Sequence, residues 1–273
     1  MAALMLSNLV LVLLAVGCVL FQQHRRAKKL EYAIKIVCEA YSRGQYQKGL
    51  TLAESLKRRK SKTAAYWFFR GTLLYQLGDL SEAESCLRSG IALESEPRKK
   101  ALGREALGKV QMEQKRYEEA LRSFEASIQD SPNRGSGHRA TAEAWLRQGI
   151  RDADALNFAL LAVENARTAQ NVTQPLEEYQ LAESLTTMAW AVAVHSGEAS
   201  EVERLIGEAF SQCGEDQKPV LGHLHYLAGA AYSVLGTTDA RDQSAYHFQE
   251  AAAIDPQGNF GRLAKAAAHS AAV

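Results

Sequence analysis

Three histidines in the C-terminal part of the chain have side chains that could bind a metal or transfer a proton. His223 and His225 are two residues apart, and His247 follows on the next predicted helix. Residues two apart on a helix do not share a face, so His223 and His225 are not placed to ligate one ion together. We therefore expect surface or groove positions for these histidines and no metal site.

Other patterns of catalytic residues are missing as well. The sequence contains no GxGxxG, GxxxxGK[ST], HExxH or GxSxG motif. The four cysteines, Cys18, Cys38, Cys86 and Cys213, are too far apart for a CxxC zinc or redox site. The sequence therefore predicts a protein that is not an enzyme and needs no cofactor.

Residues 107–132 show the spacing of two short amphipathic helices joined by a tight turn. Gly108 and Ala120 are small and twelve residues apart, where two helix axes could approach within about 8–10 Å. Phe124 would fill the space beneath this crossing, and Pro132 would end the second helix. This pattern resembles the tetratricopeptide repeat (TPR) family, whose signature combines W-x₂-L-G-x₂-Y, A-x₃-F and P.

The same spacing recurs along the chain, as it must if each helix pair is to bury its apolar face against a neighbour. Equivalent positions are held by Gly44, Tyr46, Gly49 and Ala53; by Trp67, Gly71, Gly78, Ala83 and Leu87; by Ala142, Trp145, Gly149, Ala155 and Ala159; by Trp190, Gly197, Val202, Ile206 and Ala209; and by Gly229, Tyr232, Gly236, Phe248, Ala251 and Pro256. Six helix pairs are therefore predicted between residues 30 and 256. The first and fifth pairs are the least regular. Residues 258–268 are predicted to form a last helix that caps the final pair.

The predicted fold is all-α: a right-handed superhelical α-solenoid of TPR helix hairpins, preceded by one N-terminal transmembrane helix. Residues 1–22 would be the anchor, 23–169 the first four repeats, and 170–273 the last two repeats with the capping helix. The boundary near residue 170 coincides with a polar stretch that ends at Pro175. Val and Ile are sparse after the first twenty residues, and no alternating apolar pattern indicates a strand.

The predicted anchor, residues 2–21, is an unbroken apolar run without a charged side chain. At about 1.5 Å per residue, a helix of this length spans the roughly 30 Å hydrocarbon core of a bilayer. No Lys or Arg precedes it, whereas Arg25, Arg26, Lys28 and Lys29 follow directly. This order favours an uncleaved anchor with the repeats in the cytoplasm. A cleaved signal or lipoprotein leader and a buried apolar helix are the alternatives.

The net charge of +1 hides two oppositely charged halves. Residues 22–116 contain 21 Lys and Arg against 10 Asp and Glu, a net +11, whereas residues 117–273 contain 11 against 21, a net −10. The basic half holds two clusters: Lys57, Arg58, Arg59, Lys60 and Lys62, and then Arg98, Lys99 and Lys100. Either cluster could complement a helix dipole or contact anionic lipid headgroups at the membrane surface.

In TPR proteins the first helix of each pair lines a concave groove, and the resemblance assigns such a protein-binding groove here. Its main residues would be Phe68, Tyr75, Lys109, Met112, Arg139, Glu143, Arg147 and Tyr226, with Thr72, Gln76, Glu105, Glu113, Leu146, His223 and Ser233 beside them. Such a mixture suits a helical or extended peptide. Arg139 and Arg147 are expected to point into solvent. For Phe68, Tyr75 and Met112, packing at repeat junctions is the equal alternative.

These features predict a membrane-anchored TPR scaffold that binds an unidentified protein or peptide through its groove. It would be a single-pass membrane protein, held in the lipid bilayer by residues 2–21, with no small-molecule substrate. An exported or periplasmic scaffold is one alternative. A nucleic-acid-binding module that uses the basic half is another, but aromatic residues do not interleave the basic runs, which disfavours it.

Overall fold

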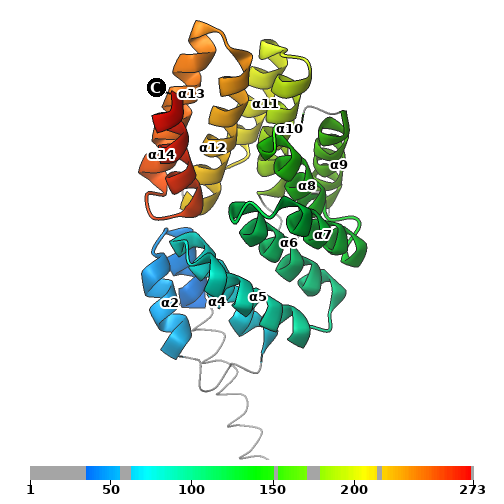
Figure 1. Cartoon of the computed structure of the whole chain (residues 1–273), viewed down its shortest axis with the longest axis vertical. Coiled ribbons are helices and arrows are strands. Elements are labelled where there is room, and N and C mark those ends of the chain that lie inside the picture. Colours follow the sequence, from blue (N-terminus) through cyan, green and yellow to red (C-terminus); the bar gives the residue numbers. More distant parts are fainter. Residues whose placement is uncertain (1–34, 56–62, 151–152, 171–178, 214–216, 272–273) are drawn as a thin grey trace, which may run out of the picture.

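The computed structural model describes residues 35–55, 63–150, 153–170, 179–213 and 217–271 (Figure 1). Within these residues every regular element is a helix and no strand occurs, which confirms the predicted all-α fold. The predicted anchor at residues 2–21 lies outside the described residues. None of the helices in the described part of the chain combines the length and the apolar character needed to cross a bilayer.

The helices form consecutive hairpins, as the repeat pattern predicts. The hairpins are residues 35–42 with α2 (Tyr46–Ser55), α4 (Ala64–Leu77) with α5 (Leu80–Leu93), α6 (Pro97–Glu113) with α7 (Tyr117–Asp130), α8 (Gly135–Arg147) with α9 (Ala153–Gln170), α10 (Gln180–His195) with α11 (Ala199–Ser211), and α12 (Lys218–Leu235) with α13 (Thr238–Ile254). Helix α14 (Asn259–Ala271) follows the last of them. The division of the chain near residue 170 stays a prediction, because residues 171–178 are outside the described part.

A small residue lies where the two helices of a hairpin cross. Gly108 of α6 faces the ring of Phe124 in α7, and a Cβ atom added at Gly108 would overlap that ring. Gly229 of α12 meets Phe248 of α13 in the same way, and an added Cβ would lie 2.8 Å from the ring. The structure therefore places Phe124 directly against Gly108, where the sequence predicts that it fills the space beneath the crossing of Gly108 and Ala120.

Gly108→Leu is expected to lower the free energy of unfolding by roughly 1–3 kcal/mol, because overpacking forces the crossing helices apart. Phe124 is fully buried, so its ring has no free space to enter. Urea denaturation followed by circular dichroism measures the change. Gly207→Leu is the control, because no atom lies within 4 Å of a Cβ added at Gly207. If Gly108→Leu and Gly207→Leu unfold alike, Gly108 is not at the crossing.

The turn inside each hairpin needs a residue in the left-handed conformation. Gly78 and Gly236 supply it with φ angles of 85° and 72°, at no steric cost. Between α6 and α7, Lys115 takes this position with a φ of 61°, the single such non-glycine residue in the described part of the chain. The next helix then begins at a capping side chain in two hairpins, where Asp79 and Thr237 accept hydrogen bonds from the first turn.

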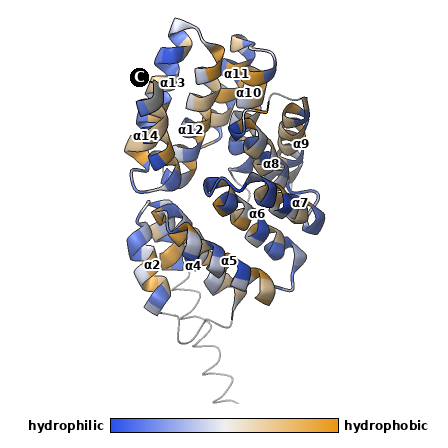
Figure 2. Cartoon of the chain, viewed as in Figure 1, coloured by the Kyte–Doolittle hydropathy of each residue, from blue (hydrophilic) through white to orange (hydrophobic). Residues whose placement is uncertain are grey.

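The apolar core runs through the hairpins in three clusters. One joins α8 through α14 and includes Leu185 and Leu224, a second joins the first hairpins through Tyr46 and Leu73, and a small third one surrounds Phe124. Figure 2 shows apolar and polar residues mixed on most helices, α6 and α7 among them. Each helix therefore packs through part of its surface and carries polar side chains on the rest.

The end of the solenoid returns to its beginning. Helix α14 covers α12 and α13, as predicted for a cap, and it also contacts α4 (Figure 1). The hydroxyl of Tyr46 in α2 donates a hydrogen bond of 2.8 Å to Asp255 Oδ1, across 209 positions of sequence. The sequence predicts a concave groove, and these contacts close the helices into a ring so that the concave face becomes an interior.

Candidate functional site

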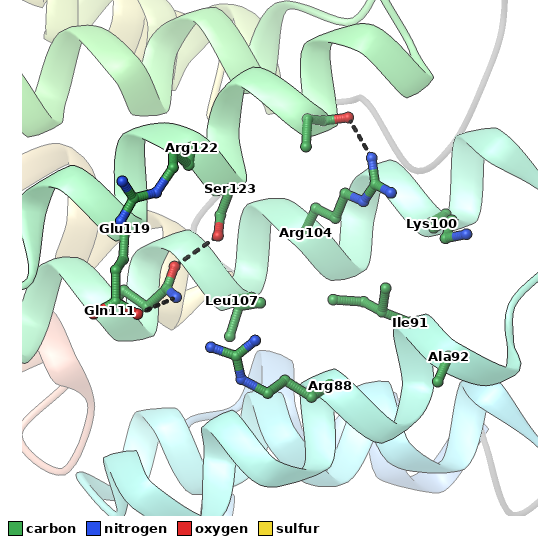
Figure 3. Close-up of a pocket in the computed structure, with 11 residues that line it drawn as sticks. Arg88, Ile91, Ala92, Lys100, Arg104, Leu107, Gln111, Glu119, Arg122 and Ser123 are labelled. Atoms are coloured by element: carbon green, nitrogen blue, oxygen red, sulfur yellow. Dashed lines mark hydrogen bonds between the residues drawn. The ribbon is translucent and has the colours of Figure 1, made fainter.

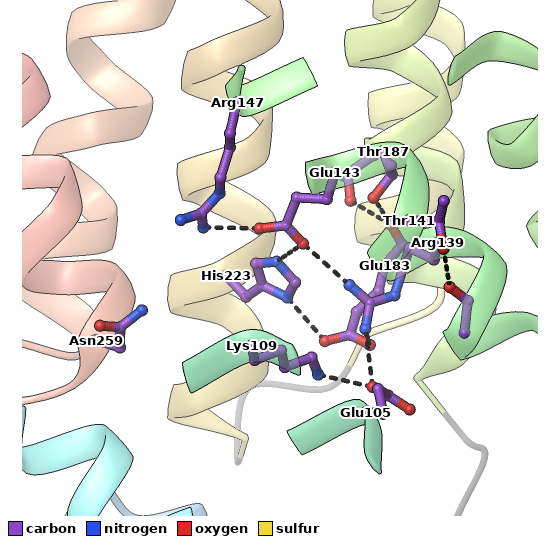
Figure 4. A network of polar contacts seen from close by, with 12 residues as sticks. Glu105, Lys109, Arg139, Thr141, Glu143, Arg147, Glu183, Thr187, His223 and Asn259 are labelled. Atoms are coloured by element: carbon purple, nitrogen blue, oxygen red, sulfur yellow. Dashed lines mark hydrogen bonds and ion pairs between the residues drawn. The ribbon is translucent and has the colours of Figure 1, made fainter. Parts of the chain in front are cut away.

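The first helices of several hairpins direct charged side chains into the interior of the ring. Figure 4 shows its centre, where side chains of α6, α8, α10 and α12 meet. Arg139 of α8 is 1% exposed. Its guanidinium lies 3.4 Å from Glu143 Oε2 and 3.3 Å from Glu183 Oε2. Glu105 Oε1 lies 3.6 Å from the same guanidinium and 2.8 Å from Lys109 Nζ.

Arg147 and His223 extend this cluster. Arg147 Nη2 lies 2.7 Å from Glu143 Oε1, and Arg147 Nη1 donates a hydrogen bond of 2.8 Å to Glu113 Oε1. His223 Nδ1 lies 2.8 Å from Glu183 Oε1, and His223 Nε2 lies 3.4 Å from Glu143 Oε2. The imidazole is thus held between two carboxylates. We call the following side chains the inner network: Glu105, Lys109, Arg139, Glu143, Arg147, Glu183 and His223.

The buried carboxylates of the inner network stay ionised because nearby cations outweigh the loss of water. Burial raises the pKa of Glu183, but Arg139 and the hydrogen bond from His223 outweigh it and lower the pKa to about 2. Burial also opposes ionisation of Glu143, yet Arg147 holds its pKa well below the usual range. Removing one partner from such a cluster leaves an uncompensated buried charge.

The expectation that Arg139 and Arg147 point into solvent is wrong. Their side chains are 1% and 8% exposed, because the first helices of the neighbouring hairpins, α6 and α10, pack beside α8 and carry carboxylates. Glu143 is buried with them. The ring of Tyr226 is half-buried, with the guanidinium carbon of Arg147 5.1 Å from its centroid. Whether these residues bind a partner stays a prediction.

Phe68 and Met112 pack at junctions between repeats, which was the alternative to a place in the binding groove. The ring of Phe68 fills the space that side chains at Gly90 and Gly103 would need, between α5 and α6. Met112 is 2% exposed inside the small apolar cluster. Tyr75 is also buried, but its hydroxyl reaches a segment from the far end of the chain.

That segment comprises residues 255–262, and we call it the closing segment. It enters the interior where α13 ends and α14 begins. Asn259 Nδ2 donates hydrogen bonds to Tyr75 Oη at 2.8 Å and to Glu113 Oε1 at 2.9 Å. The backbone N–H of Asn259 donates to Gln76 Oε1 at 2.9 Å. The closing segment therefore binds side chains of the second and third hairpins, more than 140 residues away in sequence.

An aromatic residue and an arginine complete these contacts. The ring of Phe260 stacks on His223 with 3.8 Å between centroids, and the Tyr226 centroid is 5.7 Å away. The guanidinium of Arg262 donates to the backbone carbonyl of Gln76 at the end of α4. The sequence pattern predicts only a cap on the last hairpin, and no local spacing indicates these contacts.

A cavity of about 110 Å³ remains beside the inner network, between Tyr75, Lys109, Glu183, His223 and Phe260. A molecule of liquid water occupies about 30 Å³, so the cavity has room for a few waters. A peptide could therefore bind the inner face only if the closing segment moved away.

A larger pocket of about 730 Å³ opens between α5 and the α6–α7 hairpin. Figure 3 shows Arg88, Lys100, Arg104 and Arg122 around Leu107 in this pocket. Arg88 and Arg104 pair with carboxylates of their own hairpins at 2.7 and 3.0 Å. Two of the four cations are thus already neutralised, which weakens this pocket as an anion site.

Of the two basic clusters predicted to contact lipid, one lies in the part of the chain that the structure describes and the other lies outside it. Arg98 and Lys99 are exposed in the first turn of α6, and Lys99 Nζ lies 2.6 Å from Glu96 Oε2. Lys100 lines the pocket of Figure 3. Lys57, Arg58, Arg59, Lys60 and Lys62 lie outside the described residues. Lipid contact by either cluster stays a prediction.

His225 and His247 form a second buried polar feature. Their Nδ1 atoms lie 3.0 Å apart, and the ring of Phe210 packs against both. Burial lowers the pKa of each to about 4, and for His247 the charge of the neighbouring His225 acts in the same direction. This pair could have been predicted from the crossing of Gly229 and Phe248. His225 lies one turn before Gly229 and His247 lies next to Phe248, so both histidines are close to that crossing. No three metal-ligating side chains converge in the part of the chain that the structure describes.

Comparison with known proteins agrees with the repeat pattern. Residues 34–92 and 105–170 match the family described as tetratricopeptide repeat. None of the curated proteins compared matches the chain. Among solved structures, the APC/C hetero-tetramer Cut9–Hcn1 is similar with a TM-score of 0.56 and 12% identity, over 83% of this chain and 39% of that chain.

The chain covers nearly the whole length of two other solved structures but superposes on them less well. PilF of Pseudomonas aeruginosa has a TM-score of 0.49 and 16% identity, over 88% of this chain and 98% of that chain. YrrB, a TPR protein with an unusual peptide-binding site, has a TM-score of 0.41 and 17% identity, over 78% and 97%. At these identities the likeness concerns the fold alone. The hairpins and the small residues at their crossings agree with the match of residues 34–92 and 105–170 to the tetratricopeptide repeat family.

Proposed function

We propose that this chain is a scaffold that binds a peptide segment of another protein on its inner face. The observation that carries this proposal is the closing segment. Side chains of the second, third and sixth hairpins already bind it, through Gln76, Glu113 and His223. An interior that binds one non-repeat segment has the chemistry to bind another of similar composition.

We further propose that the scaffold is not an enzyme. His223 is the histidine nearest the interior cavity, and both of its ring nitrogens already face carboxylates. The cavity beside it, about 110 Å³, is also far smaller than the roughly 300–1,000 Å³ typical of small-molecule sites.

Site-specific photo-crosslinking in intact cells tests the binding surface. A benzophenone amino acid placed at Lys109, on the inner face, should capture the partner. The same amino acid at Arg241, exposed on α13, should capture much less. Capture through Arg122 but not Lys109 would move the binding surface to the pocket of Figure 3 and contradict the proposal.

The proposed scaffold is anchored by residues 2–21, with its repeats in the cytoplasm. The length of the apolar run and the basic residues that follow it support this topology. Membranes washed with alkaline carbonate should retain the full chain, and deletion of residues 1–22 should release it. Protease added outside intact cells should leave the repeats uncut. Cleavage from outside would instead support an exported or periplasmic scaffold.

A further inference from the structure

We propose that the inner face recognises peptide segments with Asn, an aromatic residue and Arg at positions one, two and four, and that the closing segment occupies this site as a ligand in cis. The inference rests on the proposed function and names the chemistry of the partner. In this chain the three positions are Asn259, Phe260 and Arg262. A partner would bind by replacing them.

The first position selects an amide. Asn259 is 4% exposed, and both protons of its side-chain amide have acceptors, Tyr75 Oη and Glu113 Oε1. Aspartate in this place would have no proton to donate and would face the carboxylate of Glu113. Because a buried like-charge contact of this kind is costly, the site should reject aspartate.

The second position selects a flat ring. Phe260 stacks on His223 with an interplanar angle of 16°, and contacts with Glu143 and Glu183 hold the imidazole in place. An aliphatic side chain could fill part of the volume but could not stack. The preference for an aromatic residue therefore follows from the fixed orientation of His223.

The fourth position selects a cation at a helix end. Arg262 donates to the backbone carbonyls of Tyr75 and Gln76, next to the last residue of α4. Carbonyl groups at the C-terminal end of a helix carry partial negative charge and lack helical partners. A guanidinium reaches both carbonyls at once and brings a full positive charge to the helix end, which a neutral side chain does not.

The closing segment can leave this site without dismantling the last hairpin. Its contacts with α4 and α6 are hydrogen bonds, whereas Ala264 of α14 is buried in the same apolar cluster as Leu224 of α12. Gly261 is the weak point, because a Cβ added there would overlap the carbonyl of Asp255. Asp255 belongs to the same segment, so Gly261→Ala should distort the fold of the closing segment and weaken its contacts with the site. The residues of the site on α4, α6 and α12 stay unchanged.

Peptide binding to the full chain in detergent micelles tests the proposal. The probe is a fluorescein-labelled peptide with the sequence of residues 255–268, and the readout is fluorescence anisotropy. A tethered ligand acts at an effective concentration on the order of millimolar, so the wild-type site should be masked. Gly261→Ala should bind the peptide roughly ten-fold or more tightly than wild type. Gly207→Ala, which adds a methyl group in open space on α11, should behave as wild type.

The peptide itself provides the specificity arms. Peptides that carry Asn259→Asp or Phe260→Leu should bind the Gly261→Ala protein at least several-fold more weakly than the peptide with the native sequence does. Equal binding of these peptides, or no difference between Gly261→Ala and Gly207→Ala, would overturn the proposal. If Gly261→Ala loses its helical circular dichroism, Asn259→Ala with Arg262→Ala replaces it. Failure of both proteins to fold would show that the segment is required structure, which also overturns the proposal.

The peptide-binding test and the photo-crosslinking test can fail independently of each other. Peptide binding without any photo-crosslinked partner at Lys109 would keep the site and contradict the scaffold. A crosslinked partner whose yield is the same in wild type and Gly261→Ala would keep the scaffold and contradict occupation in cis.

Discussion

Replacing Arg139 with alanine is expected to lower the free energy of unfolding by about 3–5 kcal/mol, the cost of removing one partner from a buried ion pair. Its guanidinium lies within 3.6 Å of Glu105, Glu143 and Glu183. Alanine would leave these three carboxylates facing one another without the buried guanidinium between them. The protein would have to protonate one of them or admit water, and either change destabilises the native state.

Urea denaturation at pH 7 measures this effect. Arg204→Ala is the control, because Arg204 is exposed on α11 and its ion pairs with Glu201 and Glu208 should contribute little. A loss for Arg139→Ala as small as that for Arg204→Ala would show that water reaches the inner network. Arg139→Glu combined with Arg147→Glu should prevent folding, since it places two further negative charges beside Glu143.

Lowering the pH from 7 to 5 is expected to reduce the free energy of unfolding by on the order of 2–4 kcal/mol, through the pair His225 and His247. The pKa of each is about 4 in the folded chain, against about 6.5 for an ordinary histidine. Between these values the unfolded chain binds more protons than the folded chain, so stability falls as pH falls. Below about pH 5 the pKa of Glu183, about 2, adds a loss in the same direction.

Urea titrations at pH 7, 6 and 5 test the histidine contribution. His225→Phe with His247→Phe keeps the aromatic volume and removes both titrating groups, so stability should change much less between pH 7 and pH 5. His195→Phe, at the exposed end of α10, should keep the wild-type dependence. If the double variant also keeps it, other groups cause the acid sensitivity.

The sequence alone was enough to predict the helix pairs and the way each pair closes. The offsets between Gly108, Ala120 and Phe124 lie within one hairpin, and such local contacts depend on helix geometry and side-chain size. The turn at Lys115 and the cap formed by α14 follow from the same local rules. Each hairpin packs mainly on its neighbours, so its pattern of small and apolar residues is local and can be recognised in the sequence. The family match of residues 34–92 and 105–170 agrees with that pattern.

Only the tertiary structure decided that the ring closes and what its interior contains. The contact between Tyr46 and Asp255, like the site of Asn259, depends on the summed rotation of all the hairpins between them. A small change of angle per hairpin would separate these residues, and no local spacing specifies that angle. Arg139 illustrates the consequence: its place on the inner side of α8 was predictable, but its burial was not. Burial required carboxylates from α6 and α10 of the two neighbouring hairpins, and no spacing within α8 specifies how closely those helices approach.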